Sequence, residues 1–265
     1  MDTFLYIIIF IMGTFFGSFY TLSVYRIPKR QDIVHTHSYC PNCNHKLGLF
    51  DLFPVFSYIF LGGKCRYCKQ KIRPRYLILE ALSGILFVVM ALLLGIRIDN
   101  LNVQNIRQMS FMALYLTFLI LIAGIDKETK KIDKYVNIYG IVISLVYMIY
   151  LCVIENTSIY RYVIYIIGYI IMLLIGKSKK YKDNNNIQII IMSITIAIFT
   201  GEYILFNTLL LTIMSIMINL LIERIKNNKQ KEENEIVKQI PIGFCLSFSN
   251  ILLLICILGY INYIV

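Results

Sequence analysis

Eight long apolar runs, separated by short polar connections, constrain the fold of this chain more than any other feature. They cover residues 4–24, 77–95, 111–125, 136–154, 160–176, 187–200, 203–222 and 240–265. A helix needs roughly 20 apolar residues to cross about 30 Å of hydrocarbon. Only 15% of the residues are charged, whereas soluble domains carry about a quarter. The pattern predicts an all-α, polytopic membrane helix bundle with about eight transmembrane helices, of which the run at 187–200 is the weakest.

The basic residues alternate between the connections. All of the 26 Lys and Arg residues except Arg97, Arg107 and Arg161 lie in the first, third, fifth and seventh connections. Lys and Arg gather on the cytoplasmic side of membrane proteins. The alternation therefore predicts that these charged loops are cytoplasmic and that the lipid bilayer is the main partner. It explains the net charge of +11 without nucleic acid. The first run lacks a basic start and a cleavage site, so we expect a retained helix.

Four cysteines in the first connection form two CxxC pairs, Cys40 with Cys43 and Cys65 with Cys68. Disulfides are rare in the reducing cytoplasm, and two such turns present four thiolates that can surround zinc as a tetrahedron. The spacing predicts a small cytoplasmic zinc-knuckle domain at about residues 25–76. Because four thiolates leave no open coordination position, we expect the zinc to be structural. The alternative is four free thiols in a flexible loop. All three histidines lie in this loop, and we expect them to be solvated.

Acidic residues at the ends of the apolar runs are the candidate catalytic groups. Asp126 directly follows the third run, Asp183 precedes the sixth, and Glu80 lies one turn into the second. Ionisable groups at membrane depth are costly and often functional. Two carboxylates that share a site hold one proton between them and can activate water against a peptide carbonyl. Without further context, Asp126, Glu128 and Asp133 also fit a solvated loop of mixed charge.

Six segments, in order along nearly the whole chain, resemble the type IV prepilin leader peptidase/N-methyltransferase family. These are Gly17-Ser18-Phe19, Tyr25-Arg26-Ile27-Pro28, the two CxxC pairs, Arg75-Tyr76-Leu77-Ile78-Leu79-Glu80, the stretch from Asp126 to Asp133, and Ile240-Pro241-Ile242-Gly243-Phe244. The pair Asp126 and Asp133 is similar to the first aspartate motif of the family, and residues 240–244 are similar to its closing segment.

The resemblance implies a GxGD-type membrane aspartic endopeptidase. Such an enzyme removes the short basic leader from type IV prepilin or pseudopilin precursors at the cytoplasmic face of the bacterial inner membrane. The resemblance implies Asp126 and Asp183 as the water-activating pair, with Glu80 and Asp133 in supporting or substrate-binding roles. It also implies N-methylation of the new N-terminus with S-adenosylmethionine, although the chain contains no Gly-rich nucleotide loop. The expected domains are residues 1–95, with the zinc loop, and a six-helix peptidase domain at 105–265.

The sequence departs from the family where the second aspartate is expected. The family has Gly-x-Gly-Asp at the start of the sixth span, but residues 179–186 read KKYKDNNN. Asp183 is the nearest carboxylate, whereas a gapless fit to the following helix puts Asn186 at that position, and an amide cannot share a proton. The alternative function is therefore an inactive homologue that binds prepilins as a chaperone or scaffold. A transporter is disfavoured, because transporters place ionisable residues near the midplane and here they lie at run ends.

Overall fold

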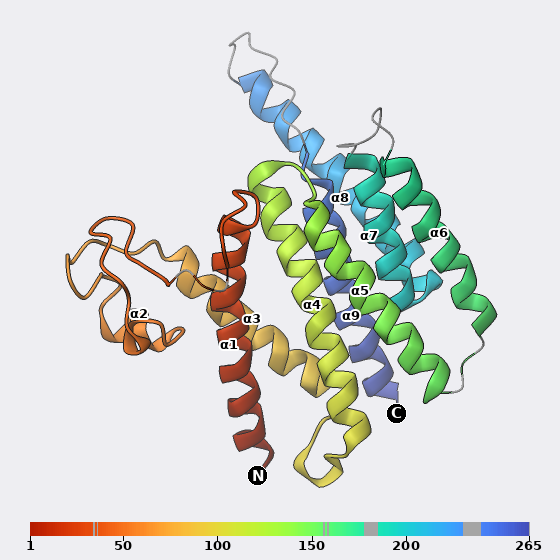
Figure 1. The fold of residues 1–265 in the computed structure, drawn as a ribbon, viewed down its shortest axis with the longest axis horizontal. Helices are drawn as coiled ribbons and strands as arrows, with labels where there is room; N and C mark the ends of the chain where they lie inside the picture. The colour runs from red at the N-terminus through yellow and green to blue at the C-terminus, as the bar shows by residue number, and fades with distance from the viewer. Residues whose placement is uncertain are drawn as a thin grey trace. The chain divides into compact units, whose positions relative to one another are not determined.

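The computed structural model describes residues 1–33, 35, 37–155, 157, 159–177, 185–229 and 240–264. Over these ranges the chain forms helices, short 3-10 turns and two isolated antiparallel bridges. The α-helices are α1 (Asp2–Arg26), α2 (Phe56–Phe60), α3 (Arg75–Leu93), α4 (Val103–Thr129), α5 (Lys134–Val153), α6 (Ile159–Lys177), α7 (Asn185–Thr200), α8 (Glu202–Lys229) and α9 (Ile242–Ile264) (Figure 1).

Each of the eight apolar runs forms one of the long helices. Among the described residues, six helices are long and apolar enough to cross a membrane, and the apolar parts of α6 and α7, Tyr162–Gly176 and Asn185–Thr200, are shorter. The predicted fold class, an all-α membrane helix bundle, is confirmed. The chain is therefore a multi-pass membrane protein. The short α2 lies inside the first connection and has no counterpart among the predicted runs.

By its packing the chain divides into two units. The first comprises Met1–Ala113 with Ile261–Val265, and the second comprises Leu114–Tyr260. The division falls inside α4, which begins in the first unit and ends in the second. The domains expected from the sequence, residues 1–95 and 105–265, remain a prediction.

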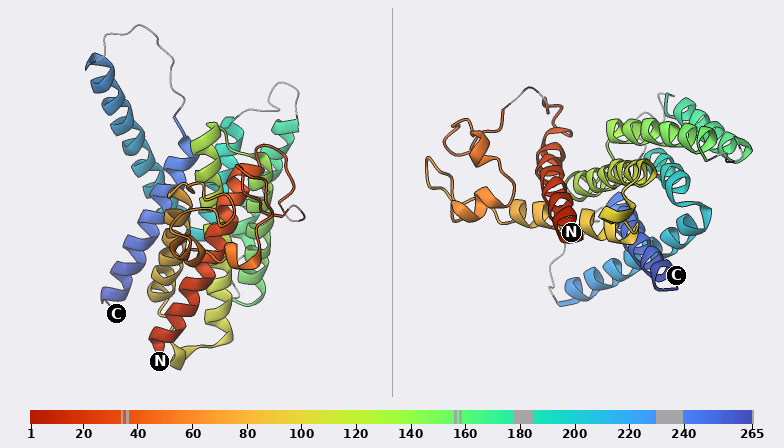
Figure 2. Two further views of the ribbon diagram at one scale, coloured as in Figure 1. Left: turned by 90° about the vertical axis from the view of Figure 1, so that its left-hand side faces the viewer. Right: turned by 90° about the horizontal axis from the view of Figure 1, so that it is seen from below.

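In the first unit, α1 packs closely against α3 through small residues (Figures 1 and 2). A Cβ atom added to Gly13 would lie 2.8 Å from the Cα of Gly84, and one added to Gly17 would lie 2.8 Å from the Cα of Glu80. Glycines four residues apart let helix backbones approach closely in membranes, where van der Waals contact drives association. Gly13 and Gly17 therefore set the distance between these helices, and that distance positions Glu80 beside α1.

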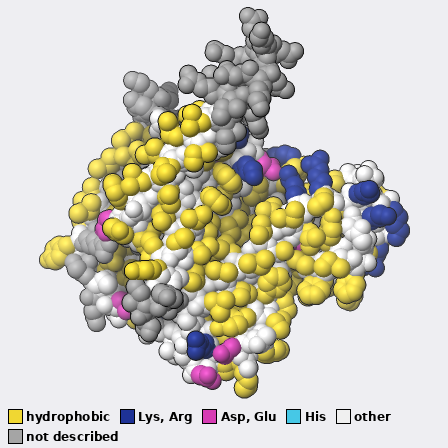
Figure 3. All heavy atoms as spheres, turned by 180° about the vertical axis from the view of Figure 1, so that it is seen from behind, with side chains coloured by type: hydrophobic (Ala, Val, Ile, Leu, Met, Phe, Trp, Pro, Cys, Tyr) yellow, Lys and Arg dark blue, Asp and Glu magenta, His cyan; other side chains and the backbone are white. Residues whose placement is uncertain are grey.

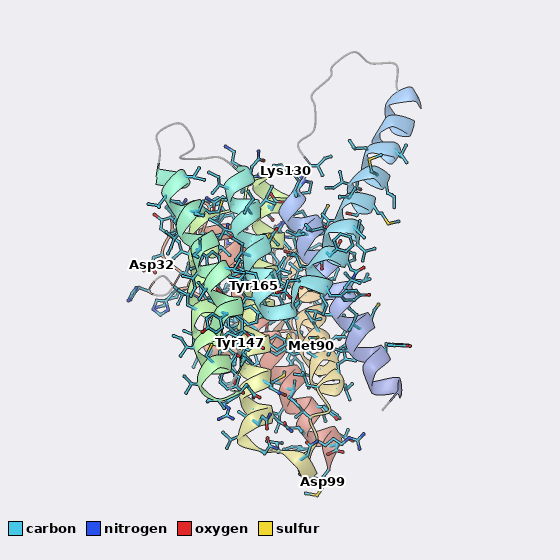
Figure 4. The ribbon with its side chains drawn as sticks, turned by 90° about the vertical axis from the view of Figure 1, so that its right-hand side faces the viewer. Asp32, Met90, Asp99, Lys130, Tyr147 and Tyr165 are labelled. Carbon is cyan, nitrogen blue, oxygen red and sulfur yellow. The ribbon has the colours of Figure 1, made fainter. Side chains whose placement is uncertain are left out.

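In the second unit, α7 packs against α5, α6 and α8. Its core includes the buried residues Met148, Tyr162, Tyr169, Ile187, Ile191 and Ile198. Tyr147 from α5 and Tyr165 from α6, labelled in Figure 4, pack against this cluster. The Tyr169 hydroxyl lies 3.0 Å from Ser144 Oγ and 2.8 Å from Thr195 Oγ1, so its polar group is paired inside the bundle.

Hydrophobic side chains cover most of the face shown in Figure 3, and Lys and Arg side chains gather near its margins. Many large apolar side chains on the helices are exposed, among them Ile8, Phe15 and Ile164. Extended exposed apolar surface is unusual for a soluble monomer and is typical of proteins solvated by lipid.

Candidate catalytic and metal sites

The four cysteines of the first connection lie together. The Sγ atoms of Cys40, Cys43, Cys65 and Cys68 all lie within 4.8 Å of one another, and Cys40 Sγ is 3.8 Å from Cys68 Sγ. With Zn–S bonds of about 2.3 Å, the edge of a tetrahedral four-thiolate site measures about 3.8 Å. The cluster thus has the donor set and the spacing to hold a metal ion of this kind. His45 is not part of it, because its ring lies against that of Tyr67, with centroids 3.5 Å apart.

The two cysteine turns share one backbone geometry with a spacing of 25 residues. In the first turn Cys40 N donates to His45 O at 3.0 Å, and in the second Cys65 N donates to Gln70 O at 2.9 Å. The bridges Tyr39–Lys46 and Lys64–Lys71 also match with this spacing. Asn44 and Lys69, at corresponding positions, have φ values of +55° and +57°. The two predicted knuckle turns are therefore formed by the chain itself.

The thiols of this cluster differ in acidity. The backbone N–H of Gln70 and the side-chain amide of Asn42 donate to Cys68 and lower the pKa of its thiol to about 6. The Asn42 Nδ2 to Cys68 Sγ distance is 3.6 Å. The backbone N–H of His45 lowers the pKa of the Cys43 thiol. Burial and the neighbouring thiols of Cys40 and Cys68 raise it by a larger amount, so the resulting pKa is about 11. Of these two thiols, Cys68 is thus the one in the thiolate form that binds cations at neutral pH.

Asp126, the first candidate catalytic acid, is fully buried near the C-terminal end of α4. Its Oδ2 accepts a hydrogen bond from the backbone N–H of Phe244, 3.0 Å away, in the first turn of α9. The N-terminus of a helix carries unpaired N–H groups and a partial positive charge, so it favours a carboxylate. The other oxygen, Oδ1, is buried and has no hydrogen-bond partner among the described residues.

The approach of α9 to Asp126 depends on Gly243. A Cβ atom there would lie 3.0 Å from Ile122 Cγ2 and 3.0 Å from Ile132 Cγ1, so this position has little room for a side chain. The Lys127 ammonium also lies over the Phe244 ring, 5.0 Å from its centroid. Residues 240–244, which resemble the closing segment of the family, thus lead into the first turn of α9. The Phe244 N–H in this turn binds the Asp126 carboxylate.

The other acids of the first aspartate motif lie at the end of α4 and at the start of α5. Asp133 begins α5 as its N-cap residue, and its Oδ1 accepts from Tyr135 N at 2.8 Å. Glu128 is exposed. Lys130, labelled in Figure 4, adopts a φ of +59° where the helix ends. Asp133 therefore supports the local turn, and Asp126 alone of these three acids is buried in the bundle.

The second candidate acid, Asp183, lies outside the described residues. The described chain resumes at Asn185, whose Oδ1 accepts a hydrogen bond from Ile132 N at 3.0 Å. Asn186, the alternative partner suggested by the sequence, is an exposed residue in the first turn of α7. The start of α7 therefore reaches the same turn that follows Asp126.

Glu80 lies in the first unit, on α3. Its Oε2 accepts from the backbone N–H of Val55 at 2.8 Å. Val55 has a φ of +63°, and Phe56 N donates to Pro54 O at 2.6 Å across it, so these residues form a γ-turn of the rare, strained kind. Glu80 thus holds the strained turn that begins α2. Nothing in the sequence marks Val55, Asn42 or the N–H of Phe244 as functional. Pro241 indicates only where α9 begins.

Comparison with known proteins finds relatives that match part of the chain. Residues 11–94 match the family model described as "Bacterial Peptidase A24 N-terminal domain". Relatives named "Prepilin leader peptidase/N-methyltransferase" include the protein of Myxococcus xanthus, 37% identical over 81 residues, which are 31% of this chain and 24% of the relative. The Klebsiella pneumoniae protein is 29% identical over 128 residues, which are 46% of this chain and 52% of the relative.

The Bacillus subtilis protein of the same name is 35% identical over 92 residues, which are 35% of this chain and 37% of the relative. The chain therefore spans about half or less of the length of these curated relatives. No solved structure matches the chain.

Proposed function

We propose that this chain, which is similar over part of its length to proteins named prepilin leader peptidase/N-methyltransferase, is a membrane aspartic endopeptidase of that family. Its proposed substrates are type IV prepilin-like or pseudopilin precursors, from which it removes the short basic leader. Cleavage takes place at the cytoplasmic face of the inner membrane, on the side where the basic connections gather. The names of the relatives support the substrate class.

The observation that carries this proposal is the environment of Asp126. The N-terminus of α9 holds one oxygen of its carboxylate, and the other oxygen is buried without a partner in the described parts of the chain. A carboxylate fixed in this way has a defined orientation and one oxygen left for a proton, a water molecule or a second acid. Because Asp126 is fully buried, the reaction also requires that water and the scissile peptide gain access to it.

Asp183 is the proposed second acid. The contact between Asn185 and Ile132 supports this assignment, because it brings the start of α7 to the turn that follows Asp126. Two carboxylates that share one proton act as an acid and a base. The ionised acid takes a proton from water, whose oxygen attacks the scissile carbonyl carbon, while the protonated acid donates to the carbonyl oxygen. The C–N bond then breaks as the leaving amine is protonated.

Zinc is the proposed metal of the cysteine cluster, with a structural role. Cys40, Cys43, Cys65 and Cys68 would hold it, and it would join the two cysteine turns. The donor set of four thiolates and the Sγ spacing fit zinc. N-methylation with S-adenosylmethionine rests on the names of the relatives alone, and we assign no residue to it.

One observation favours the alternative function, a catalytically inactive homologue that binds prepilins as a chaperone or scaffold. The described α7 side chain that reaches the turn after Asp126 is an amide, Asn185, and not an acid. An amide can fix the turn, but it cannot share a proton with Asp126.

The two functions are separated by co-expressing the full chain with a prepilin-type precursor and following leader removal by mass spectrometry. The expected result is cleavage by the unmodified protein, loss in Asp126→Asn and Asp183→Asn, and full retention in the control variant Glu128→Gln. Cleavage that survives in either aspartate variant contradicts the catalytic pair. Binding of the precursor without any cleavage by the unmodified protein identifies the scaffold.

A further inference from the structure

We propose that residues 49–61 of the zinc loop, here called the wedge segment, insert into the lipid bilayer beside α1 and hold the metal cluster at the membrane surface. The segment contains a 3-10 turn, Leu49–Asp51, and the helix α2. This role is independent of the proposed peptidase activity. It concerns the surface that the loop presents to lipid.

The first argument is depth. The Phe53 ring packs edge to face on the Phe15 ring of α1, with centroids 5.3 Å apart. Phe15 precedes Arg26, the last residue of α1, by 11 positions. At 1.5 Å per residue it lies about 16 Å along the helix axis from that basic end, which is about half the thickness of the hydrocarbon core. Figure 1 accordingly shows α2 beside the middle of α1.

The second argument is the chemistry of the exposed surface. Leu49, Phe50 and Phe60 are 88%, 87% and 84% exposed, so the segment presents its largest apolar side chains outward. Fully exposed aromatic side chains of this kind favour a membrane interface over water. Phe15 of α1, whose ring contacts Phe53 of the segment, is itself exposed.

The third argument is that the single charge of the segment is paired. Asp51 is the one charged residue among 49–61. Its Oδ1 accepts from Arg66 Nε at 2.6 Å, its Oδ2 accepts from the Tyr67 hydroxyl at 3.3 Å, and its side chain is only 6% exposed. A carboxylate near lipid is tolerated when such partners replace water.

The fourth argument is that many backbone groups of the segment are paired with each other or with neighbouring residues. Ser57 N donates to Phe53 O, Leu61 N donates to Ser57 O, and Gly63 N donates to Tyr58 O. The Val55 N–H donates to the Glu80 side chain of α3 and not to a carbonyl of the segment. Backbone groups left without partners in hydrocarbon cost several kcal/mol each, so this pairing is what insertion requires.

The wedge segment itself carries no basic residue, and Arg66 of the second cysteine turn pairs with its Asp51. Lys46, Lys64, Lys69 and Lys71 are exposed on the two cysteine turns. In Figure 3 the Lys and Arg side chains of the loop gather on one side of it, at the right, with hydrophobic side chains below them. Such side chains attract anionic lipid headgroups, each by about 1 kcal/mol near the surface. The loop therefore has the charge distribution of a domain seated in a bilayer.

The chain contains no tryptophan, which allows a direct test. Phe50→Trp and Phe60→Trp would be prepared separately in the full-length protein, reconstituted in phosphatidylcholine vesicles with acyl chains brominated at defined carbons. We expect the bromines to quench both residues to an extent comparable with Ile8→Trp, an exposed position on α1. The control Tyr39→Trp, on the first cysteine turn, is expected to be quenched by aqueous iodide instead. Metal content verifies that each variant keeps the loop fold.

Two outcomes would overturn the proposal. Quenching of Trp at positions 50 and 60 by iodide, and not by the bromines, would mean that the wedge segment faces water. A loss of iodide quenching only after addition of a hydrophobic prepilin-type peptide would mean that the segment is a docking surface for a protein helix. Using two positions keeps the test valid if one variant fails to fold.

Discussion

The carboxylate of Asp126 and the backbone N–H of Phe244 form a 3.0 Å hydrogen bond that joins the end of α4 to the first turn of α9, across 118 positions of sequence. The acid that the sequence singles out for catalysis therefore also anchors a helix. Loss of activity in an Asp126 variant could then arise from chemistry or from a loosened α9, and a matched pair of substitutions separates these effects.

Asp126→Asn keeps an oxygen that accepts from Phe244, whereas Asp126→Ala removes it. A hydrogen bond to a charged group contributes about 1.5–3 kcal/mol, and a buried unpaired N–H adds a penalty of similar size. We expect the Ala variant to lose thermal stability in detergent and the Asn variant to retain most of it, while both lose leader cleavage. Equal stability of the two variants would contradict the anchoring role of this bond.

Gly17 is expected to tolerate no larger side chain. Gly17→Leu would force the backbones of α1 and α3 apart, because even a Cβ atom would lie 2.8 Å from the Cα of Glu80. Overpacking of this kind typically costs about 1–3 kcal/mol. The control is Gly48→Ala in the same unit, where the nearest atom is Asp51 Oδ2 at 3.7 Å. Thermal unfolding in detergent should show a lower midpoint for the Leu variant and little change for the control.

Val55 offers a substitution that is expected to stabilise the chain. A β-branched residue at φ +63° is strained by roughly 1–3 kcal/mol, and glycine adopts this conformation without that strain. Val55→Gly should therefore raise the unfolding midpoint. Ile59→Gly, inside α2, should lower it, since glycine weakens a helix. A lower midpoint in both variants would show that Val55 is not strained.

Glu80 is expected to act as a hydrogen-bond acceptor for Val55 and not through its charge. Glu80→Gln retains an acceptor oxygen, and Glu80→Ala leaves the Val55 N–H without one, at a cost of about 1–3 kcal/mol. Limited proteolysis of the zinc loop should be faster in the Ala variant and unchanged in the Gln variant. Equal acceleration in both variants would point to a requirement for the carboxylate charge.

Asn42 is expected to set the pH at which the metal leaves. Its amide helps to hold the pKa of Cys68 at about 6, so Asn42→Ala should raise that pKa. Metal binding requires the thiolate, and protonation competes with it. With a higher pKa, protons displace the metal at a higher pH, so zinc release during acid titration should shift upward in pH. Pro41→Ala, an exposed neighbour without this hydrogen bond, should titrate like the unmodified protein.

The bundle could be predicted from the sequence because lipid imposes a simple rule, namely long apolar runs with charges between them. The paired cysteines were equally readable, since their spacing alone defines two turns. The partner of Asp126 was not readable, because the Phe244 N–H belongs to the backbone and no residue type marks it. The partner of Glu80 was not readable for the same reason, since the carboxylate accepts from the backbone of Val55.

The two cysteine turns repeat each other's backbone hydrogen bonds at a spacing of 25 residues, and each closes on itself. Neither turn lends a strand or a helix to the other, and they meet through side chains, among them Asn42 with Cys68 and His45 with Tyr67. The backbone frame of each turn is thus set locally, and the stretch between them contacts the second turn through side chains such as Asp51 with Arg66. Substitutions in that stretch can in this way change how the loop contacts its surroundings while the two cysteine turns keep their backbone structure.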